Sequence, residues 1–345
     1  MSQYFAPSFI CPVPPEPVTL CNNSIIIKDG DVEFIVGKTA QFEFPESARA
    51  IGGTLKTPQY QVLLKAIVAL SLGEGEHDVS LALSVAQNWI ENFREKPGSI
   101  KLSEENNKLL ITHLKEIKFR RGSSDSAIKT CKINIQNDPT VYFETQAVTH
   151  CLPSQFKNYV LWQIGHGDLQ QIVLIDGKPV KNALQRAEGL SGAIKRFARN
   201  TKLSEAEAIK AWHLGTRPES DEMNGKRVDC SAEKRKAARE YFSHSINRLL
   251  NTMQDYKERV RNIILSGGAS KDDIAVEILR DEVEQTGWYK LHVINNLSVK
   301  NEKLEDPVFV CAYGLANAPI MQQYEGKRLG IDVGNFALKS VLIGE

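Results

Sequence analysis

Hydrophobic residues recur along the chain with two different periods, and the alternation of these periods predicts its elements. The stretch "SIIIKDGDVEFIVG" (24–37) has two apolar runs around a Lys-Asp-Gly-Asp turn, which is typical of a β-hairpin. Apolar residues at three- and four-residue steps over 57–72 predict a helix with one buried face. "DVSLALSVAQ" (78–87) is almost entirely apolar and predicts a strand covered on both faces. The other expectations for this half are strands before residue 45, a helix at 88–96, and loops with strand-like pieces from 99 to 141.

The second half of the chain repeats the same alternation. Its expected elements are, in order, a strand–glycine turn–strand unit over 158–178, helices at 189–200 and 204–215, a long helix from 231 to about 258, a strand ending in a glycine turn over 261–270, a helix at 272–282, a strand at 289–294, a short helix with a connector over 305–328, and a final hairpin from 328 to 345. Strands and helices that alternate in this way predict an α/β protein whose sheets are covered by helices.

Composition and charge narrow the class of protein. With 345 residues, 42% of them hydrophobic, the chain is long enough for about two domains with separate cores. A net charge of +1 excludes a global field that would draw it to nucleic acid or membrane. No apolar run approaches the ~18 residues of a membrane span, and the N-terminus lacks the pattern of a signal peptide. The six cysteines are scattered and form no C-x-x-C pair, so we expect free thiols and a cytoplasmic location.

Three glycine turns follow predicted strands, near 165–167, 267–268 and 334. Glycine lets a backbone approach a ligand closely, and N–H groups exposed in such turns bind phosphate oxygens. Each turn alone is more often only a turn. Three of them in one α/β chain, two on hairpins, favour a phosphate site.

Five stretches together resemble a known family. "IDVGNFALKSVLI" (331–343) resembles the first phosphate motif of the actin-like ATPases, and "QIGHGDLQQIVLIDGK" (163–178) resembles their second. "IILSGGAS" (263–270) resembles their adenosine motif, while "VYFETQAV" (141–148) and "DPVFVCAYGLA" (306–316) resemble their two connecting segments. The similarity is to the ParM-like proteins of bacterial plasmid segregation and to archaeal actin-like proteins. It implies a two-domain actin-like fold of the ribonuclease-H-like type.

The order of these motifs differs from the family's. The first phosphate hairpin normally begins such a chain, whereas here it ends it, so the sequence resembles a circularly permuted actin-like fold. About ten residues, "APIMQQYEGK", would join the old ends. The resemblance implies a domain I made of residues 1–155 and 318–345, and a domain II made of residues 156–317.

The resemblance also implies a site for ATP or GTP with Mg²⁺ in the interdomain cleft. Asp332 would hold Mg²⁺ through water molecules, and Lys339 would neutralise the phosphates. The alternatives are an aspartate that caps a turn and a surface lysine, and for His166 an exposed turn residue. The implied nucleotide-binding residues are Asp332, Gly334, Asn335, Lys339, Gly165, His166, Gly167, Ser266, Gly267, Gly268 and Ala269.

Three residues are the candidates for hydrolysis. Glu144 lies where the family keeps the residue that orients the attacking water, although Gln146 offers another register. Gln163 replaces an aspartate of the second phosphate motif and cannot accept a proton. Asp168 supplies the missing charge if its side chain points into the cleft; otherwise hydrolysis is slow, or nucleotide binding is the whole function.

The family resemblance implies an ATPase or GTPase that forms head-to-tail filaments. By the same resemblance its cargo would be plasmid DNA, attached through a separate DNA-binding adaptor. The basic cluster at 226–240 is interleaved with acids and favours a solvated face over direct nucleic-acid binding. Two alternatives stay open: a small-molecule kinase of the actin and sugar-kinase superfamily, and a nucleotide-binding scaffold without hydrolysis.

Overall fold

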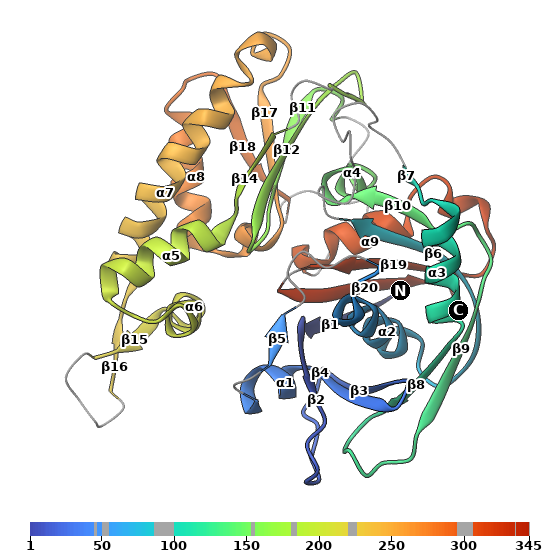
Figure 1. Ribbon diagram of the computed structural model, residues 1–345. Coiled ribbons are helices and arrows are strands. Elements are labelled where there is room, and N and C mark those ends of the chain that lie inside the picture. The colour runs from blue at the N-terminus through green and yellow to red at the C-terminus, as the bar shows by residue number, and fades with distance from the viewer. Residues whose placement is uncertain are drawn as a thin grey trace. The chain divides into compact units, whose positions relative to one another are not determined.

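The chain forms two compact units, each with its own sheet and core (Figure 1). Unit 1 consists of Met1–Cys151 and Phe309–Glu345, and unit 2 of Leu152–Val308. The computed structural model describes residues 1–44, 47–49, 55–85, 100–152, 156–180, 185–219, 226–294, 306–334 and 336–344.

Unit 1 is built on one long, strongly curved sheet. The sheet has the order β1-β20-β19-β6-β9-β8-β3-β4-β2-β5, and β10 pairs with the second half of β6. Because β1 and β2 are separated by Ser8 alone yet lie near opposite ends of this order, the sheet curls back on itself. The strands are β1 (Ser2–Pro7), β2 (Phe9–Pro12), β3 (Ser24–Asp29), β4 (Val32–Gly37), β5 (Ala48–Arg49), β6 (Gly75–Val85), β7 (Ile100–Lys101), β8 (Glu116–Arg120), β9 (Lys129–Ile135), β10 (Thr140–Phe143), β19 (Lys327–Val333) and β20 (Ala337–Ile343), and the helices are α1 (Lys38–Glu43), α2 (Pro58–Leu72), α3 (Glu104–Leu114), α4 (Glu144–Thr149) and α9 (Val310–Ala316), with 3₁₀ turns at Pro307–Phe309 and Met321–Gln323.

The curved sheet wraps around α2. The prediction of one buried face is wrong for this helix, because residues on all its sides are buried, including Val62, Leu63, Leu64 and Ala66. A helix that is apolar all round has to lie inside a core. Even Lys65 is buried, and its ammonium lies 2.6 Å from a carboxylate oxygen of Asp29 on β3.

The segment from 99 to 141 contains a helix that the hydrophobic pattern did not predict. α3 begins at an N-cap, Ser103, whose hydroxyl accepts a hydrogen bond from the backbone N–H of Asn106. Only Leu110 and Leu114 of this helix are buried, so its apolar periodicity is weak. The helix predicted at 88–96 lies outside the described residues.

Unit 2 has a smaller sheet covered on one face by helices. Its order is β13-β12-β11-β17-β18, and β14 also pairs with β12. The face that carries Val160, Trp162 and Ile164 packs against α5, α7 and α8 in one hydrophobic core. The strands are β11 (Tyr159–Ile164), β12 (Asp168–Ile175), β13 (Lys178–Pro179), β14 (Gln185–Glu188), β15 (Thr216–Pro218), β16 (Arg227–Asp229), β17 (Asn262–Ser266) and β18 (Lys290–Val293), and the helices are α5 (Leu190–Thr201), α6 (Glu205–Leu214), α7 (Ser231–Asn251) and α8 (Asp273–Glu284), with 3₁₀ turns at Gln254–Tyr256 and Gly268–Lys271.

The long helix α7 ends earlier than the predicted residue 258. The backbone N–H groups of Thr252 and Met253 donate to the carbonyls of Leu249 and Leu250, three residues back. The Thr252 hydroxyl also donates to the Leu249 carbonyl at 2.7 Å. These contacts tighten the last turn into 3₁₀ geometry and stop the helix.

Four strands of each sheet have the same arrangement but a different order along the chain. In unit 2 the antiparallel hairpin β11–β12 precedes the parallel strands β17 and β18 in the sequence. In unit 1 the corresponding hairpin, β19–β20, follows the parallel strands β6 and β10 and ends the chain. The hairpin predicted at 328–345 is thus confirmed, and β20 pairs with β1 so that Ser2 stands opposite Leu342. Figure 1 shows the two chain ends close together in unit 1.

The helix α9 belongs to unit 1, although the sequence placed it at the end of domain II. It packs directly on the backbone of β19: a Cβ added to Gly330 would lie 2.0 Å from the Ala312 carbonyl oxygen. It crosses α4 equally closely, since a Cβ on Gly314 would lie 1.9 Å from the Ala147 carbonyl oxygen. These two glycines let the helices and the strand meet backbone to backbone.

All six cysteines are free thiols. Within the parts of the chain that the structure describes, every helix is too short or too polar to cross a membrane.

Candidate functional site

The centre of the candidate site in unit 1 is a buried ion pair on the terminal hairpin. Asp332 on β19 stands opposite Lys339 on β20, and the lysine ammonium lies 2.5 Å from the Asp332 Oδ2. Asp332 is 1% exposed, and the Ser84 hydroxyl donates to its Oδ1 at 2.7 Å. The seven-residue spacing of the two charges therefore places them side by side across an antiparallel hairpin.

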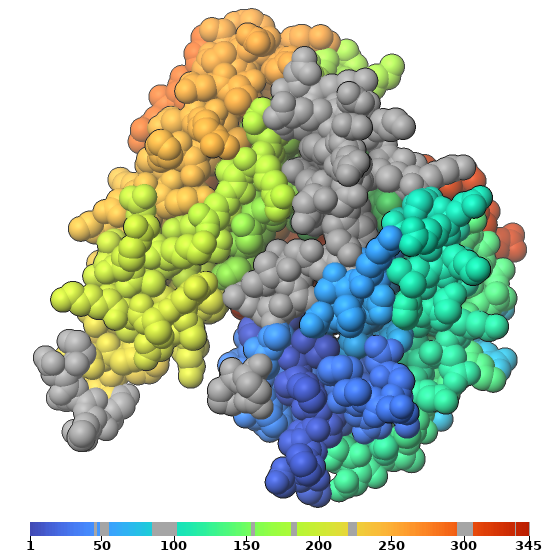
Figure 2. All heavy atoms as spheres, in the orientation of Figure 1, coloured from blue at the N-terminus to red at the C-terminus, as the bar shows by residue number. Residues whose placement is uncertain are grey.

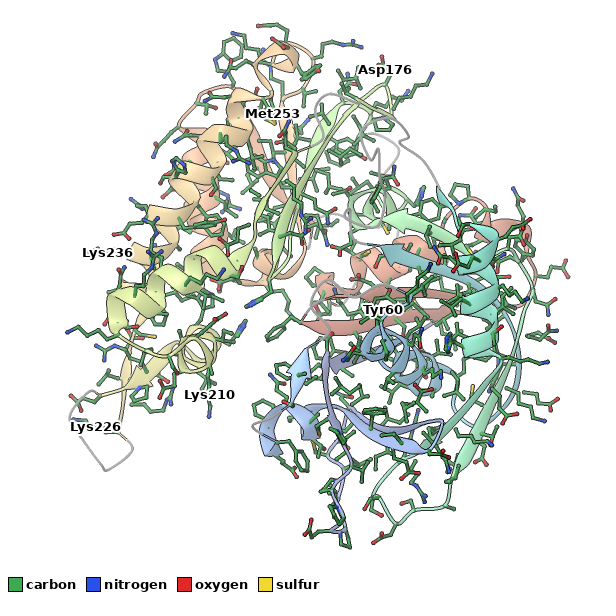
Figure 3. The ribbon with its side chains drawn as sticks, in the orientation of Figure 1. Tyr60, Asp176, Lys210, Lys226, Lys236 and Met253 are labelled. Carbon is green, nitrogen blue, oxygen red and sulfur yellow. The ribbon has the colours of Figure 1, made fainter. Side chains whose placement is uncertain are left out.

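The charges around this pair come from several elements of unit 1. Burial alone would lower the pKa of Lys339, but the carboxylates of Asp332 and Glu144 and the hydrogen bond with Asp332 raise it above the ordinary lysine value. Burial, and then the same two carboxylates, raise the pKa of the Tyr60 phenol on α2. Figure 3 shows Tyr60 within the curved sheet. We call Asp332, Lys339, Glu144 and Ser84 the hairpin cluster.

These shifts predict that unit 1 loses stability in alkali. The folded states of Tyr60 and Lys339 hold their protons at pH values where the unfolded chain, with pKa values of ~10 and ~10.4, releases them. The contribution of these two groups to the free energy of unfolding is therefore flat from about pH 7 to 9 and falls above about pH 10. Urea unfolding of Tyr60→Phe should show a smaller alkaline fall than the unaltered chain. An identical fall in both proteins would contradict the assignment to Tyr60.

Glu144 and Gln146 are the two residues that the sequence offered for orienting the attacking water, and their side chains have different surroundings in the structure. Glu144 is the first residue of α4, directly after β10, and its charge acts on Lys339. The Gln146 side chain turns back instead, and its Oε1 accepts a hydrogen bond from the backbone N–H of Phe143 at 3.3 Å. Glu144 is thus the residue whose charge reaches the cluster, while its catalytic role stays a prediction.

The turn of the terminal hairpin is internally bonded. The Gly334 N–H donates to the Ala337 carbonyl at 3.0 Å, and the Ser8 hydroxyl donates to the Gly334 carbonyl at 2.6 Å. The predicted use of the Gly334 N–H for phosphate therefore requires this turn bond to open. Asn335 lies outside the described residues.

The second glycine turn, Gly165–His166–Gly167, is held by the start of α5. The backbone N–H groups of Gly189, Leu190 and Ser191 donate to the carbonyls of Gly167, Gly165 and His166. Sequence reasoning missed Gly189, where a Cβ would lie 2.4 Å from the Gly165 carbonyl oxygen. Its only sequence signal is a glycine before an amphipathic helix.

The two polar residues predicted beside this turn differ in their surroundings. Gln163 on β11 is buried, and its Oε1 has no hydrogen-bond partner among the residues that the structure describes. The Asp168 carboxylate accepts a hydrogen bond from the Gln170 amide at 2.9 Å and lies 3.4 Å from the Arg186 guanidinium. Arg186 therefore balances the charge that Asp168 was expected to supply.

The third glycine turn leads into a pocket of unit 2. Ser266 and Ala269 are buried, and Gly267 has φ +86° with its Cβ position 2.5 Å from the Ile164 carbonyl oxygen. A Cβ on Gly268, by contrast, would meet nothing within 4 Å. Of these four residues, Gly268 is the one that lines the pocket.

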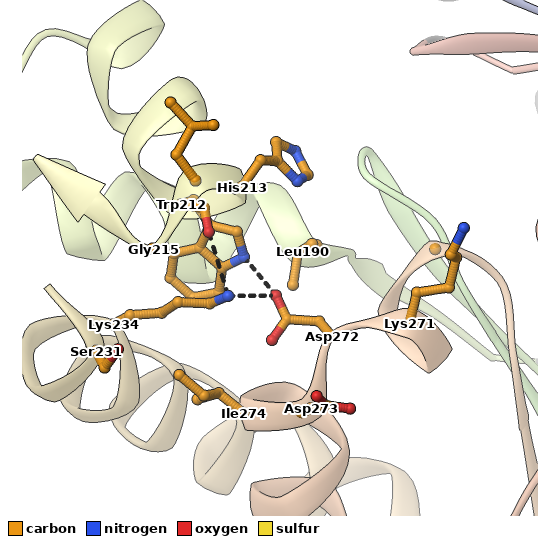
Figure 4. Close-up of a pocket in the computed structure, with 12 residues that line it drawn as sticks. Leu190, Trp212, His213, Gly215, Ser231, Lys234, Lys271, Asp272, Asp273 and Ile274 are labelled. Carbon is orange, nitrogen blue, oxygen red and sulfur yellow. Dashed lines mark hydrogen bonds and ion pairs between the residues drawn. The ribbon is translucent and has the colours of Figure 1, made fainter. Parts of the chain in front are cut away.

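The pocket has a volume of about 370 Å³ and an ionic network at its wall (Figure 4). Asp272 Oδ2 lies 2.8 Å from the Lys234 ammonium and accepts a hydrogen bond from the Trp212 indole N–H at 2.8 Å. Burial and the Lys234 charge lower the pKa of His213, so its imidazole is neutral at pH 7. The wall is formed by Leu190, Trp212, His213, Leu214, Gly215, Ser231, Lys234, Gly268, Lys271, Asp272, Asp273 and Ile274.

The basic residues of the cluster at 226–240 have two kinds of surroundings. Arg235 and Arg239 on α7 pair with Glu277 and Asp281 on α8, and Lys236 points outward (Figure 3). Figure 2 shows α7 (orange) and α5 (yellow-green) as part of the outer surface of unit 2. Lys234 is the exception to the predicted solvated face, because its side chain is 12% exposed and serves the pocket.

No protein-family profile and no curated protein matches the chain. Solved structures do match it over nearly its whole length. The archaeal actin homologue Ta0583 superposes with a TM-score of 0.63 at 14% identity, over 92% of this chain and 93% of its own. ParM of Bacillus thuringiensis, solved with ATP, gives 0.58 at 12% identity over 92% and 91%. The Alp12 filament structure gives 0.57 at 15% identity over 92% and 89%. The chain therefore has the actin-like fold of the archaeal actin homologue and the ParM-type proteins.

Proposed function

We propose that the chain is an actin-like ATPase that binds Mg-ATP and polymerises into filaments. The observation that carries the proposal is the buried pair of Asp332 and Lys339 on a hairpin of an actin-like fold, with the Glu144 charge beside it. The ATP solved in one similar structure and the filament of another support it.

The hairpin cluster suits a hydrated Mg²⁺ ion and phosphate. Among the described residues no three acidic, histidine or cysteine side chains gather into a metal centre. Mg²⁺ that keeps most of its water needs only one or two carboxylates, so the oriented Asp332 carboxylate is sufficient. Mg²⁺ would screen the negative charge of the phosphates. Lys339 would then share its charge between Asp332 and a phosphate oxygen, and Glu144 would orient a water molecule.

The pocket of unit 2 suits the nucleoside. Its volume is within the range of small-molecule sites, and it combines apolar walls with a few fixed polar groups. The neutral His213 imidazole and the Leu190 side chain provide surfaces for a base, while Gly268 leaves room for close approach. The choice between ATP and GTP is part of the test below.

Gly268 gives the sharpest test of the pocket. Gly268→Ala is expected to leave the melting temperature within about 2 °C, because the new methyl group meets nothing. Gly268→Leu fills the space and is expected to weaken nucleotide binding by at least about tenfold, or ~1.4 kcal/mol. Isothermal titration of both variants with Mg-ATP and Mg-GTP measures this. Full affinity in Gly268→Leu would place the nucleoside elsewhere.

For the partners, we propose that the filament carries plasmid DNA through a separate DNA-binding adaptor. The net charge of +1 and the ion-paired face of α7 support indirect attachment over direct DNA binding. The rival functions make different predictions. A kinase would consume ATP only with an acceptor alcohol and stay monomeric, and a scaffold would polymerise without releasing phosphate.

We also propose that the chain is a circular permutation of the usual actin-like order. Four strands of each sheet, β20-β19-β6-β10 and β12-β11-β17-β18, have the same arrangement, and this supports the proposal because within these four only the hairpin of unit 1 is displaced in sequence. The register of Ser2 with Leu342 brings the two chain ends to one sheet edge.

Reversing the permutation is therefore expected to preserve the protein. A chain that starts at Gly326, runs through Glu345 directly into Met1 and ends at Glu325 keeps every strand pairing, and the junction is a short hairpin loop. Its far-ultraviolet circular dichroism and nucleotide affinity should match those of the natural order within about twofold. A control opened inside β6, after Ala82, should not fold. Failure of the Gly326 chain to fold would count against the proposed permutation.

A further inference from the structure

The corner between β1 and β2 holds the turn of the terminal hairpin. Ser8 is the single residue between these two strands, and it is fully buried. Its backbone N–H donates to the Phe336 carbonyl at 3.0 Å, and its hydroxyl donates to the Gly334 carbonyl at 2.6 Å. One residue therefore binds two carbonyl groups of the same turn, although it lies 326 positions from Gly334 in the sequence.

The position of Ser8 is fixed from both sides. Pro7 ends β1 opposite Ala337, the first residue of β20, and β2 begins directly after Ser8 and pairs with β4. The Phe9 ring packs edge to face against the Phe336 ring, with 6.5 Å between the centroids. Because the chain passes at Ser8 from one part of the curved sheet to another, Ser8 cannot leave the turn unless a strand moves with it.

A turn that binds phosphate has to keep its carbonyl oxygens away from the anion. Each carbonyl oxygen is the negative end of a peptide dipole, whereas the N–H groups attract phosphate oxygens. The carbonyls of Gly334 and Phe336 both point to Ser8, which satisfies them inside the protein. In a trans peptide the carbonyl and the N–H point in opposite directions, so carbonyls that converge on one side leave the other side of the turn to N–H groups.

The two Ser8 bonds differ in kind from the bond within the turn. The Gly334 N–H donates to the Ala337 carbonyl, and this bond has to open before the N–H can bind phosphate. The bonds of Ser8 are made to carbonyls and do not compete with phosphate for an N–H group. They can therefore persist while phosphate binds and keep the opened turn in shape.

We propose that Ser8 is a positioning residue that fixes the turn of the terminal hairpin in the conformation that binds phosphate. It acts through the carbonyls of Gly334 and Phe336 and does not itself touch the nucleotide. The start of the chain thus completes a turn that lies at its end, and this turn is formed only once β1 has paired with β20. This inference rests on the proposed ATPase function, and the contacts that carry it all lie within unit 1.

The test removes the hydroxyl and compares ligands with and without phosphate. Ser8→Ala is expected to lower the affinity for Mg-ATP by about five- to tenfold, the range of one buried hydrogen bond. The affinity for adenosine, which has no phosphate, should change by less than about twofold, because that ligand does not use the turn. Isothermal titration with both ligands measures the difference. A purely structural role of Ser8 would change both affinities or neither.

Ser71→Ala is the matched control for the loss of a buried hydroxyl. Ser71 on α2 is buried in unit 1, and its hydroxyl donates to the Ile67 carbonyl at 2.6 Å. This variant also loses a bond from a serine hydroxyl to a backbone carbonyl, so its melting temperature should fall as well. Its affinity for Mg-ATP should stay within about twofold of the unaltered chain, because the turn keeps Ser8.

Ser8→Thr separates the hydroxyl from packing. The variant keeps the donor and should retain Mg-ATP affinity within about threefold, although its extra methyl group in a fully buried position lowers the melting temperature. Ser8→Cys, whose thiol is a weak donor of similar size, replaces the alanine variant if that protein does not fold, and should lose at least about threefold in affinity.

Three results would overturn the role of Ser8. They are full Mg-ATP affinity without the hydroxyl, equal losses in Ser8→Ala and Ser8→Thr, and a parallel loss of adenosine affinity in Ser8→Ala. If the unaltered chain bound no Mg-ATP, the proposed function would fail and the inference with it. If the unaltered chain and Ser8→Ala bound Mg-ATP equally well, the inference alone would fail.

Discussion

Replacing Asp332 by asparagine is expected to abolish Mg-nucleotide binding and to destabilise unit 1. The substitution removes one partner of a buried pair and leaves the Lys339 ammonium, which is 15% exposed, with weaker compensation. Breaking such a pair from one side costs about 3–5 kcal/mol. The same change removes the one carboxylate of the cluster proposed to hold hydrated Mg²⁺. Urea unfolding and isothermal titration with Mg-ATP measure the two losses separately.

The matched control is Asp29→Asn. This change also breaks a lysine–aspartate pair of unit 1, in which Lys65 on α2 is buried and Asp29 is partly buried, but the pair lies outside the hairpin cluster. It should lower stability and leave the affinity for nucleotide unchanged once the protein is folded. Equal nucleotide affinity in Asp332→Asn and the unaltered chain would show that Asp332 has only a structural role.

The second large effect is expected at Gly314. Gly314→Val would place its Cβ 1.9 Å from the Ala147 carbonyl oxygen and 3.0 Å from the Cys151 sulfur. The first contact is to backbone, which no side-chain rotation relieves. Overpacking a core costs about 1–3 kcal/mol when neighbours can adjust, and α4 and α9 cannot separate without leaving β19 and β6. We expect loss of soluble protein, or a fall in melting temperature above about 10 °C.

Gly314→Ala should be nearly as damaging as the valine, because the clash begins at Cβ. Gly268→Ala serves as the control, since its methyl group has open space around it. A Gly314→Ala protein with the same melting temperature as the Gly268→Ala protein would contradict the close packing of α4 against α9.

Local sequence signals predicted the turns of the hairpins, because the conformation of a turn depends on the residues within it. The Asp-Gly turn at residues 29–30 marks a hairpin because glycine adopts the positive φ of a tight turn, +61° at Gly30, without steric cost. The glycine turn after Ile164 marks the second hairpin. The helix α3 was not predicted because most of its residues are polar. Ser103 followed by Glu104 is nevertheless typical of a helix start. The burial of α2 on all sides depends on the sheet closing around it, which is a non-local property.

The sequence likewise predicted some features of the candidate site and missed others. Asp332 and Lys339 were expected in the site through the family resemblance, and the register of β19 against β20 places them side by side. The pairing of Asp168 with Arg186 was not predicted, because it depends on the register of β14 against β12. The network of Trp212, Lys234 and Asp272 joins α6, α7 and the start of α8, and no local pattern links these three residues.

The most direct test of the proposed function is time-resolved light scattering of the purified chain at micromolar concentration after addition of Mg-ATP, with phosphate release followed in the same sample. Mg-GTP, Mg-ADP and the Asp332→Asn protein are the controls. Scattering is expected to rise with Mg-ATP, to decay slowly as phosphate appears, and to stay at baseline in Asp332→Asn. A flat trace with both ATP and GTP, at concentrations where titration shows the nucleotide bound, would contradict a nucleotide-dependent filament.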